Sequence, residues 1–452
     1  MYLSSNDPIA AIITPPGEGA VSLIRVSGKG AIGIVSACFS KALGDRPSHT
    51  ATLGTIRSAD GRVLDSVLVL LMRGPHSFTG EDTVEISCHG GSFVTRAVLE
   101  RVIEVGARAA LPGEFSLRAF RNGKIDLAQA ESIQQLIGAK SELALHAAEQ
   151  HLEGALSKKI ALFQEGLTQV AALIEAWVDF PEEGLEFASR EEIVERLLAT
   201  TQSMERLAET FHNGRVLHEG VTLCLAGAPN VGKSSLMNAF LGFNRAIVTN
   251  IPGTTRDLLQ EPLQMGQLSL QLIDTAGIRE TDEVIEQEGI SRSRLAMQKA
   301  DLVLLLLDAS RLLEAEDRSL LSAADRDKTI VVWNKIDVAA PSVLADWPNT
   351  VAISAKEGLG LDQLEKTIVD WIHRGMAPSK EELIITRVRH FRALVQAVVH
   401  CRQAIAHLQS GVSPEFIASD LRRALIELGT IIGTDVTEDI LTEIFSQFCV
   451  GK

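Results

Sequence analysis

The chain has few aromatic residues, no excess of basic charge and no long apolar run. Phe, Trp and Tyr make up 4% of the 452 residues, and 43 Lys and Arg are outnumbered by 58 Asp and Glu, for a net charge of -15. Base-stacking surfaces need aromatic side chains, and non-specific nucleic-acid binding needs phosphate neutralisation. The composition therefore argues against a general nucleic-acid-binding protein, although a local basic patch of Arg387, Arg389, His390 and Arg392 stays open.

Cysteine is also scarce, and the five cysteines are scattered without a CxxC pair. Zinc sites and the disulfide frameworks of small secreted domains need closer spacing, so both are disfavoured and a reducing compartment is indicated. The apolar run Leu302–Leu307 has the length of a strand and is too short to cross a bilayer. The first residues do not combine a basic segment with a long apolar region. We expect a cytoplasmic protein with no membrane role.

The most specific pattern in the sequence is a glycine-rich loop that follows a predicted buried strand and precedes a predicted helix. It reads Gly227-Ala228-Pro229-Asn230-Val231-Gly232-Lys233-Ser234, the GxxxxGKS pattern of phosphate-binding loops. The glycines let the backbone curl so that N–H groups and the helix N-terminus face phosphate oxygens, and Lys233 adds a cation for the β- and γ-phosphates. Ser234 offers its hydroxyl to magnesium. The alternative, a glycine turn before a structural helix, fits this context poorly.

Three further motifs follow in the order that a Ras-like GTPase requires. In Asp274-Thr275-Ala276-Gly277, the aspartate can hold magnesium through water and the glycine can approach the γ-phosphate. In Asn334-Lys335-Ile336-Asp337, the last carboxylate can accept hydrogen bonds from guanine but would face an acceptor nitrogen in adenine, which disfavours an ATP-dependent enzyme. Ser354-Ala355-Lys356 closes the set with a backbone N–H for the guanine carbonyl oxygen. The four motifs together predict a GTPase.

Two features narrow the chemistry without deciding it. Ile278 stands where Ras-type enzymes place a water-orienting glutamine, so another group must position the water. Residues 279–288 are dense in carboxylates that can do so, or that simply form a solvated acidic loop. Asn230 and the loop Thr249–Asp257, in which Thr255 is the expected second magnesium hydroxyl, can enclose a monovalent cation beside the phosphates. Asn230 can equally cap a turn, and the spacing leaves both possibilities open.

The length exceeds what one hydrophobic core usually fills, so about three domains are expected. Residues 1–118 combine strand-like stretches such as Val67–Met72 with turns rich in Gly and Pro, which predicts a small α+β domain. Residues 119–218 and 376–452 have the spacing of amphipathic helices, and each half leaves an apolar stripe that needs partners. The predicted architecture is multidomain α/β: the N-terminal α+β domain, a discontinuous all-α domain and, inserted at 219–375, a P-loop GTPase domain with a mainly parallel sheet.

The last residues place Cys449 where a prenylation signal carries a cysteine, but Gly451 and Lys452 fit that signal poorly. A docked tail is possible, and the sequence favours a frayed one. For Cys449, a small buried thiol is the expected state.

Several short stretches outside the nucleotide motifs are also distinctive. They are Thr14-Pro15-Pro16-Gly17, Arg25-Val26-Ser27-Gly28, Phe78-Thr79-Gly80-Glu81-Asp82, Pro112-Gly113-Glu114-Phe115, Gly253-Thr254-Thr255-Arg256-Asp257 and Phe448-Cys449-Val450-Gly451-Lys452. With the inserted GTPase segment, they make the chain resemble the MnmE (TrmE) family of tRNA-modification GTPases over its whole length.

The resemblance implies a homodimer formed through the N-terminal domain, which binds 5-formyltetrahydrofolate or a related folate as a one-carbon source. It also implies a heterotetramer with the FAD-dependent partner MnmG. Together the two proteins would add an aminomethyl or carboxymethylaminomethyl group to the 5-carbon of the wobble uridine in certain tRNAs. GTP hydrolysis, stimulated by potassium, would drive the cycle. A rival from another class is a regulatory GTPase, for example in ribosome assembly, without one-carbon chemistry.

The resemblance also assigns roles to residues. Glu286 matches the glutamate that orients the attacking water through a second water, and with Lys233 it is the predicted catalytic pair. The predicted magnesium ligands are Ser234 and Thr255, the potassium ligands are Asn230, Thr249, Ile251 and Thr254, and the folate ligands are Arg25, Glu85, Lys124 and Lys452. The predicted GTP-binding residues are Asn230, Val231, Gly232, Lys233, Ser234, Ser235, Thr249, Asn250, Ile251, Pro252, Gly253, Thr254, Thr255, Asp274, Thr275, Ala276, Gly277, Asn334, Lys335, Asp337, Ser354, Ala355 and Lys356.

Overall fold

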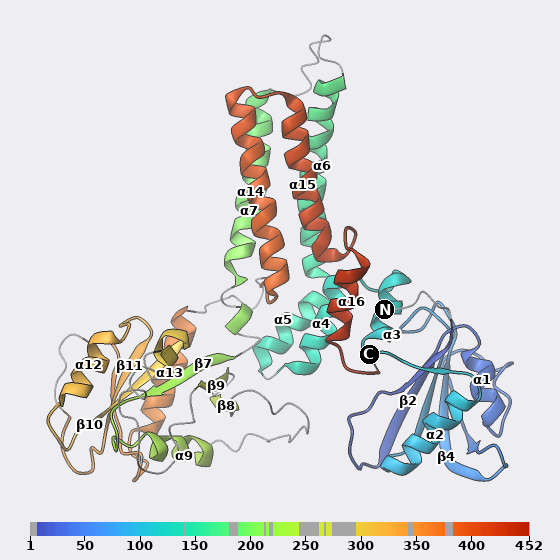
Figure 1. Cartoon of the computed structure of the whole chain (residues 1–452), viewed down its shortest axis with the longest axis horizontal. Coiled ribbons are helices and arrows are strands. Elements are labelled where there is room, and N and C mark those ends of the chain that lie inside the picture. The colour runs from blue at the N-terminus through green and yellow to red at the C-terminus, as the bar shows by residue number, and fades with distance from the viewer. Residues whose placement is uncertain are drawn as a thin grey trace. The chain divides into compact units, whose positions relative to one another are not determined.

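A computed structural model describes most of the chain as two compact units. The units comprise residues 1–137, 149–202 and 393–452, and residues 138–148 and 203–392 (Figure 1). Within them, the described residues are 7–139, 141–179, 189–211, 214–216, 220–243, 262–265, 268–273, 295–341, 347–375 and 383–451. The second unit interrupts the first in the sequence. The boundaries of the three domains stay a prediction.

The N-terminal part of the first unit is a six-stranded sheet with two helices on one face. Its strands and helices are β1 (Ile9–Ile12), β2 (Val21–Ser27), α1 (Ala31–Cys38), β3 (Thr50–Arg57), β4 (Val63–Met72), β5 (Thr83–His89), α2 (Ser92–Glu104) and β6 (Arg108–Ala109). The strand order is β3-β4-β5-β2-β1-β6. Alternate residues such as Ile24 and Ile86 are fully buried in the core under the helices. Arg25 and Glu85, one position along, lie opposite each other on the other face.

The rest of the first unit is helical, as predicted. Two of its long helices, α6 and α15, pack side by side (Figure 1). Pro414 in the first turn and Gly433, with φ 95°, at the C-cap delimit α15, because proline is tolerated where a helix begins and glycine where the backbone turns left-handed. The helices are α3 (Glu114–Arg121), α4 (Leu127–Gly138), α6 (Ala155–Asp179), α15 (Pro414–Ile432) and α16 (Glu438–Ser446), with α5 (Glu142–Leu152), α7 (Arg190–Glu209) and α14 (Val388–Ser410) including residues of both units.

The second unit contains a second six-stranded sheet. Its elements are β7 (Val221–Ala226), α9 (Lys233–Phe243), β8 (Pro262–Met265), β9 (Leu268–Ile273), β10 (Leu302–Asp308), α12 (Ala315–Ala323), β11 (Thr329–Asn334), β12 (Thr350–Ala352) and α13 (Leu361–Gly375). The strand order is β12-β11-β10-β7-β9-β8, and only β8 among them pairs antiparallel. The mainly parallel sheet predicted for the inserted segment is confirmed.

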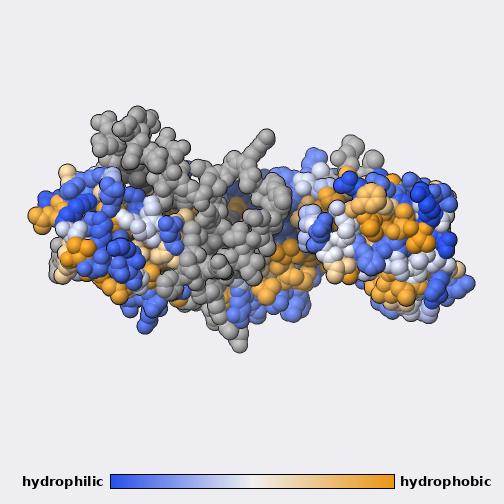
Figure 2. Space-filling model, turned by 90° about the horizontal axis from the view of Figure 1, so that it is seen from below, coloured by the Kyte–Doolittle hydropathy of each residue, from blue (hydrophilic) through white to orange (hydrophobic). Residues whose placement is uncertain are grey.

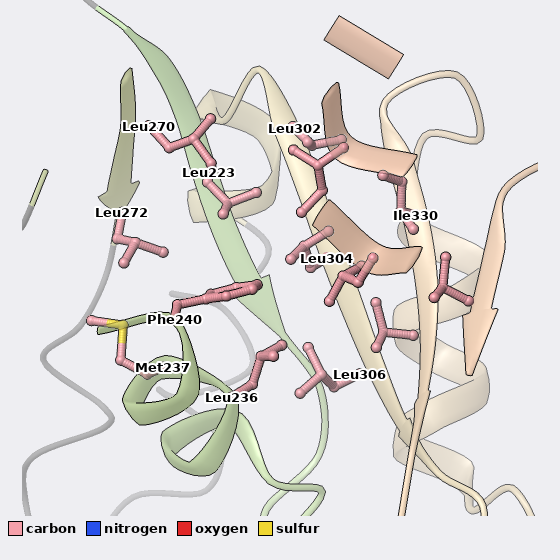
Figure 3. Packing of buried hydrophobic residues seen from close by; sticks show 14 of the residues in the cluster. Leu223, Leu236, Met237, Phe240, Leu270, Leu272, Leu302, Leu304, Leu306 and Ile330 are labelled. Carbon is pink, nitrogen blue, oxygen red and sulfur yellow. The ribbon is translucent and has the colours of Figure 1, made fainter. Parts of the chain in front are cut away.

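Strand β10 shows why this sheet forms. All seven of its residues are buried, as expected for a central parallel strand covered on both faces. Leu302, Leu304 and Leu306 belong to one core cluster, which Figure 3 shows packed with α9 side chains, among them Phe240. Leu305 faces a second cluster on the opposite side. The apolar run that is too short for a membrane is therefore the centre of the domain.

The segments that enter and leave the second unit are tied to each other. The Thr210 hydroxyl accepts a hydrogen bond from the backbone N–H of Ile385 at 2.9 Å, and the rings of Phe211 and Phe391 stack at 4.7 Å. A Cβ on Gly214 would lie 2.0 Å from the carbonyl oxygen of Ile385, so only glycine permits this approach. Side-by-side entry and exit are what an inserted domain needs.

Hydrophobic residues on the surface can be compared with what a membrane-spanning segment requires. Figure 2 shows hydrophobic residues in separate patches among hydrophilic ones on the face in view. Among the described residues, no helix combines the length and the apolar character needed to span a membrane. Of the residues in the local basic patch that the sequence left open, His390 is buried with 1% exposure and its ring contacts the Arg389 guanidinium at 3.0 Å, whereas Arg392 is exposed.

Candidate functional site

The glycine-rich loop leaves the carboxyl end of β7 and runs into α9, as predicted. Gly227 has φ 148° and Gly232 has φ 100°, in the region that favours glycine, and Asn230 adopts φ 61°. A Cβ on Gly232 would lie 2.1 Å from Nδ2 of Asn334. Ser234 and Ser235 are exposed in the first turn of α9, where backbone N–H groups have no intrahelical partner. The loop therefore presents donors and hydroxyls at a helix N-terminus.

Lys233 lies over this loop. Its ammonium donates to the carbonyl oxygens of Gly227 at 2.7 Å and Ala228 at 2.9 Å. Burial lowers the pKa of Lys233 below its ordinary value, and the negative charge of Glu316 opposes that shift. A half-buried cation held against the loop can offset the negative charge of a bound anion.

Asn334 joins two of the predicted motifs to the loop. It ends β11, is 3% exposed, and donates from Nδ2 to the carbonyl oxygen of Val231 at 2.8 Å. Its Oδ1 accepts from the backbone N–H of Ala355 at 2.9 Å. One buried amide thus connects the phosphate loop with the Ser354–Lys356 segment, using both its donor and its acceptor.

The other members of the second motif lie at the same edge of the sheet. Lys335 adopts φ 67°, and its ammonium is 2.6 Å from Oδ2 of Asp308 at the end of β10. Asp337 is exposed, and so is Lys356, whereas Ser354 is fully buried. Because the carboxyl ends of parallel strands meet at one edge, residues far apart in the sequence line one site there.

Burial by itself would raise the pKa of Asp308. Hydrogen bonds from Lys335 and Ser310 outweigh that effect and hold the pKa below its ordinary value. Asp308 is therefore a buried carboxylate that stays charged. It was not among the residues predicted from the sequence, although an acidic residue at the end of a wholly apolar strand is a usable signal.

Part of the predicted site lies outside the described residues. These residues are Thr249, Asn250, Ile251, Pro252, Gly253, Thr254, Thr255, Asp274, Thr275, Ala276, Gly277, Glu286 and Lys452.

In the first unit, the structure brings together Arg25 and Glu85. Arg25 donates from Nε to Oε1 of Glu85 at 2.9 Å, and both side chains are largely buried. The guanidinium also lies 5.2 Å from the ring centroid of Phe78 and 5.6 Å from that of Phe115. Among the described residues, no hydrogen bond to Oε2 of Glu85 is found. One carboxylate oxygen therefore stays available beside an aromatic-lined cation.

Lys124 reaches the loop that carries Phe78. Its ammonium donates to the carbonyl oxygen of Pro75 at 3.1 Å. A Cβ on Gly80 would lie 3.2 Å from Cγ of Lys124. The loop 75–80 thus links two predicted ligand positions, Arg25 and Lys124.

The C-terminal tail is docked, and the expectation of a frayed tail is wrong. Phe448 is 4% exposed and its ring centroid lies 5.2 Å from that of Phe445. Gly451 has φ 101°, and a Cβ there would lie 2.6 Å from the carbonyl oxygen of Ile12. Burial of an aromatic ring and close backbone approach hold the tail. The expectation of a buried Cys449 thiol is also wrong, because Cys449 is exposed.

The turn that receives the tail is fixed by Glu114, another residue without a predicted role. Its carboxylate is 4% exposed and accepts from Arg108 at 2.6 Å, from Arg118 at 3.1 Å and from the backbone N–H of Leu111 at 2.8 Å. Burial alone would raise its pKa, but the bonds from Arg108 and Leu111 lower it below the ordinary value. The neighbouring Gly113 N–H donates to the carbonyl oxygen of Cys449 at 3.3 Å.

Comparisons with known proteins agree with this geometry. Two protein-family models match the chain: one described as "GTP-binding protein TrmE N-terminus" at residues 8–124, and one described as "MnmE helical domain" at residues 127–449. The "tRNA modification GTPase MnmE" of Protochlamydia amoebophila is 54% identical over 99% of this chain and 98% of its own length. The protein of the same name from Moorella thermoacetica is 46% identical over 99% of this chain and 100% of its own.

Among solved structures, the G domain of the T. maritima FeoB iron transporter is 30% identical over 33% of this chain and 98% of its own, with a TM-score of 0.25. The family models and the full-length relatives are sufficient for the assignment. On this evidence, the chain belongs to the MnmE family of tRNA modification GTPases.

Proposed function

We propose that the chain binds and hydrolyses GTP at the carboxyl edge of the second sheet, and that hydrolysis serves the modification of tRNA. One observation carries the nucleotide site: the Asn334 amide ties the phosphate loop at Val231 to the predicted guanine-binding segment at Ala355. A nucleotide has its phosphates and its base at opposite ends. A buried link between the two recognition segments fixes their spacing before the ligand arrives.

The described residues around the two ends of the nucleotide have separate proposed roles. Backbone N–H groups of residues 230–235 hold the phosphates, and Lys233 offsets the charge that develops on transfer of the γ-phosphoryl group. Asp337 accepts from the guanine ring N–H and amine, while a backbone N–H of the Ser354–Lys356 segment donates to the guanine oxygen.

The described residues Ser234 and Asn230 offer oxygen atoms that suit magnesium and potassium. Ser234 is exposed at the start of α9, where its hydroxyl can bind magnesium, with Thr255 as the second hydroxyl. Magnesium, when bound, neutralises charge on the β- and γ-oxygens. Asn230 is exposed in a left-handed conformation, which suits an amide oxygen turned to a potassium ion together with Thr249, Ile251 and Thr254. Glu286 is the proposed residue that orients the attacking water.

The first unit is the proposed folate site. Glu85 has one oxygen available for the amine and ring N–H of a pterin, and the neighbouring, partly exposed Phe78 ring suits a planar ligand. Arg25, Lys124 and the terminal Lys452 supply cations for the glutamate tail. The one-carbon unit would go, in a complex with the FAD-dependent protein MnmG, to the 5-carbon of the wobble uridine of tRNA.

We further propose a homodimer that assembles with MnmG and acts in the cytoplasm. In this assembly, potassium-stimulated hydrolysis would accompany association of the two GTPase domains.

The first experiment compares GTP hydrolysis by the purified protein in potassium chloride and sodium chloride at equal ionic strength, with the Glu286→Ala variant alongside. Stimulation by potassium that the variant loses supports the cation and the glutamate roles. Equal rates in the two salts would contradict them.

A binding experiment tests the nucleotide site separately. Gly232→Ala should abolish binding of fluorescent GDP, because the added Cβ meets Nδ2 of Asn334. Gly358→Ala is the matched control, since Gly358 also has a positive φ, 74°, but a Cβ there meets nothing within 4 Å. Equal affinities of the two variants would show that the nucleotide binds elsewhere.

A third experiment separates tRNA modification from a purely regulatory GTPase. Titration of the full-length protein with 5-formyltetrahydrofolate should show saturable binding that Glu85→Gln weakens. Failure of the unsubstituted protein to bind any folate would leave the regulatory alternative.

A further inference from the structure

The carboxylate of Asp308, at the carboxyl end of β10, is held by its own neighbour Ser310, which lies outside the nucleotide-binding motifs. Its side chain is 7% exposed, and its Oδ1 accepts from the backbone N–H of Ser310 at 2.9 Å and from the Ser310 hydroxyl at 2.6 Å. A carboxylate held in this way has little rotamer freedom left. Its second oxygen is directed to one partner, the ammonium group of Lys335, at 2.6 Å.

Lys335 is held at its backbone end as well. Its neighbour Asn334 is in register with Asp308, and the Ala309 N–H donates to the carbonyl oxygen of Asn334 at 2.9 Å. The carbonyl oxygen of Lys335 accepts from the N–H of Val338 at 3.0 Å. With both ends fixed, the methylene stem of Lys335 lies along the sheet edge between β11 and β10, and 35% of the side chain is exposed.

We propose that Asp308 is a positioning residue for guanine-nucleotide binding, which holds the Lys335 stem as a preformed apolar strip for the face of the base. The inference rests on the proposed GTP site and deepens it. Asp337, two residues on, recognises the edge of the base by hydrogen bonds, and the stem contacts its face. A planar purine gains apolar contact from such a strip, and pairing with Asp308 removes the need to order a lysine side chain on binding.

The expected loss of affinity in an Asp308 variant follows from the entropy of ordering the Lys335 side chain on binding. Immobilising one long side chain at an interface weakens binding by about two- to tenfold. Asp308→Asn should therefore weaken binding of fluorescent GDP and GTP to the full-length protein by about that factor, and both nucleotides equally, because the base and not the γ-phosphate is affected.

Asp317→Asn is the matched control. Asp317 is also a buried carboxylate, 1% exposed, that binds a cation, Arg311 at 2.8 Å, and a backbone N–H, that of Glu314 at 3.0 Å. Both substitutions should lower the thermal stability of the second unit, but only Asp308→Asn should weaken nucleotide binding. Equal affinities of the two variants would show that Asp308 acts on the fold alone and would overturn the inference.

A double-mutant cycle supplies a readout that a structural role would not move. Lys335→Met keeps an unbranched apolar side chain without the ammonium group, so Asp308→Asn in that background should change the affinity little. Additive effects would overturn the inference. If the unsubstituted protein binds neither GDP nor GTP, the proposed function itself fails. If it binds them and Asp308→Asn binds equally well, only the inference fails.

Discussion

Removal of the Asn334 amide should destabilise the second unit, because two buried hydrogen bonds depend on it. Asn334→Ala leaves the carbonyl oxygen of Val231 and the N–H of Ala355 without their partners, and both hydrogen bonds are buried. An unsatisfied buried backbone group costs about 1–3 kcal/mol, so two of them cost about 2–6 kcal/mol. That is a large part of the roughly 5–15 kcal/mol that stabilises a typical domain.

Tryptophan fluorescence during urea unfolding of the full-length protein measures this cost. Of the four tryptophans in the chain, Trp333, Trp347 and Trp371 lie in the second unit, so the signal follows that unit. Gln363→Ala is the control, because it removes an exposed amide from α13. The transition of Asn334→Ala should move to clearly lower urea concentration. Coincident transitions of the two variants would refute the reasoning.

Three other predictions concern the first unit. Gly113→Ala should release the tail, because the added Cβ would lie 2.4 Å from the carbonyl oxygen of Phe445. Gly123→Ala is the control, since Gly123 has nearly the same φ (65° against 66°) but its Cβ would meet nothing within 4 Å. Limited proteolysis of the tail compares the two variants, and equal cleavage would contradict the docking. Folding lowers the pKa of Glu114, so its contribution to stability is complete above the unfolded pKa of about 4.3 and is lost as the pH falls through the lower folded pKa. Glu114→Gln should therefore flatten the acid side of the curve of stability against pH. An unchanged curve would contradict this reasoning. In the folded protein, exposed Cys449 should react with a thiol reagent before the four buried cysteines do, and mass spectrometry would follow the labelling. Cys401 should be among the slowest to react, because burial raises its pKa to about 12. Labelling of Cys401 before Cys449 would contradict the burial.

Strands were predictable where the sequence pattern was local and apolar. The predicted strand Val67–Met72 is confirmed within β4, and the predicted strand before the glycine-rich loop is confirmed as β7. Strand β3 was not predicted, because its sequence TATLGTIR has a glycine in its middle and no apolar run. A Cβ on Gly54 in this strand would lie 2.4 Å from the Phe39 ring, so the glycine is required by a neighbour distant in sequence.

The tail shows a different limit of sequence reasoning. The last few residues of a chain favour fraying when they are considered alone. The turn at Gly113 and the backbone of Ile12 provide close contacts for Phe448 and Gly451, and these contacts exist only after folding.

The sequence by itself determined which chemistry this protein carries, because the phosphate loop and the guanine motif are each an unbroken run of residues. Each motif presents its donors and acceptors from neighbouring positions of the chain. The tertiary structure decided how these motifs are joined and held. Asn334 reaches Val231, 103 positions away, and Lys335 reaches Asp308, 27 positions away. Those partners depend on the order of strands in the sheet, which places β10 beside β11 and brings their carboxyl ends to one edge. Strand order is a property of the packed sheet, and no local pattern in the sequence specifies it.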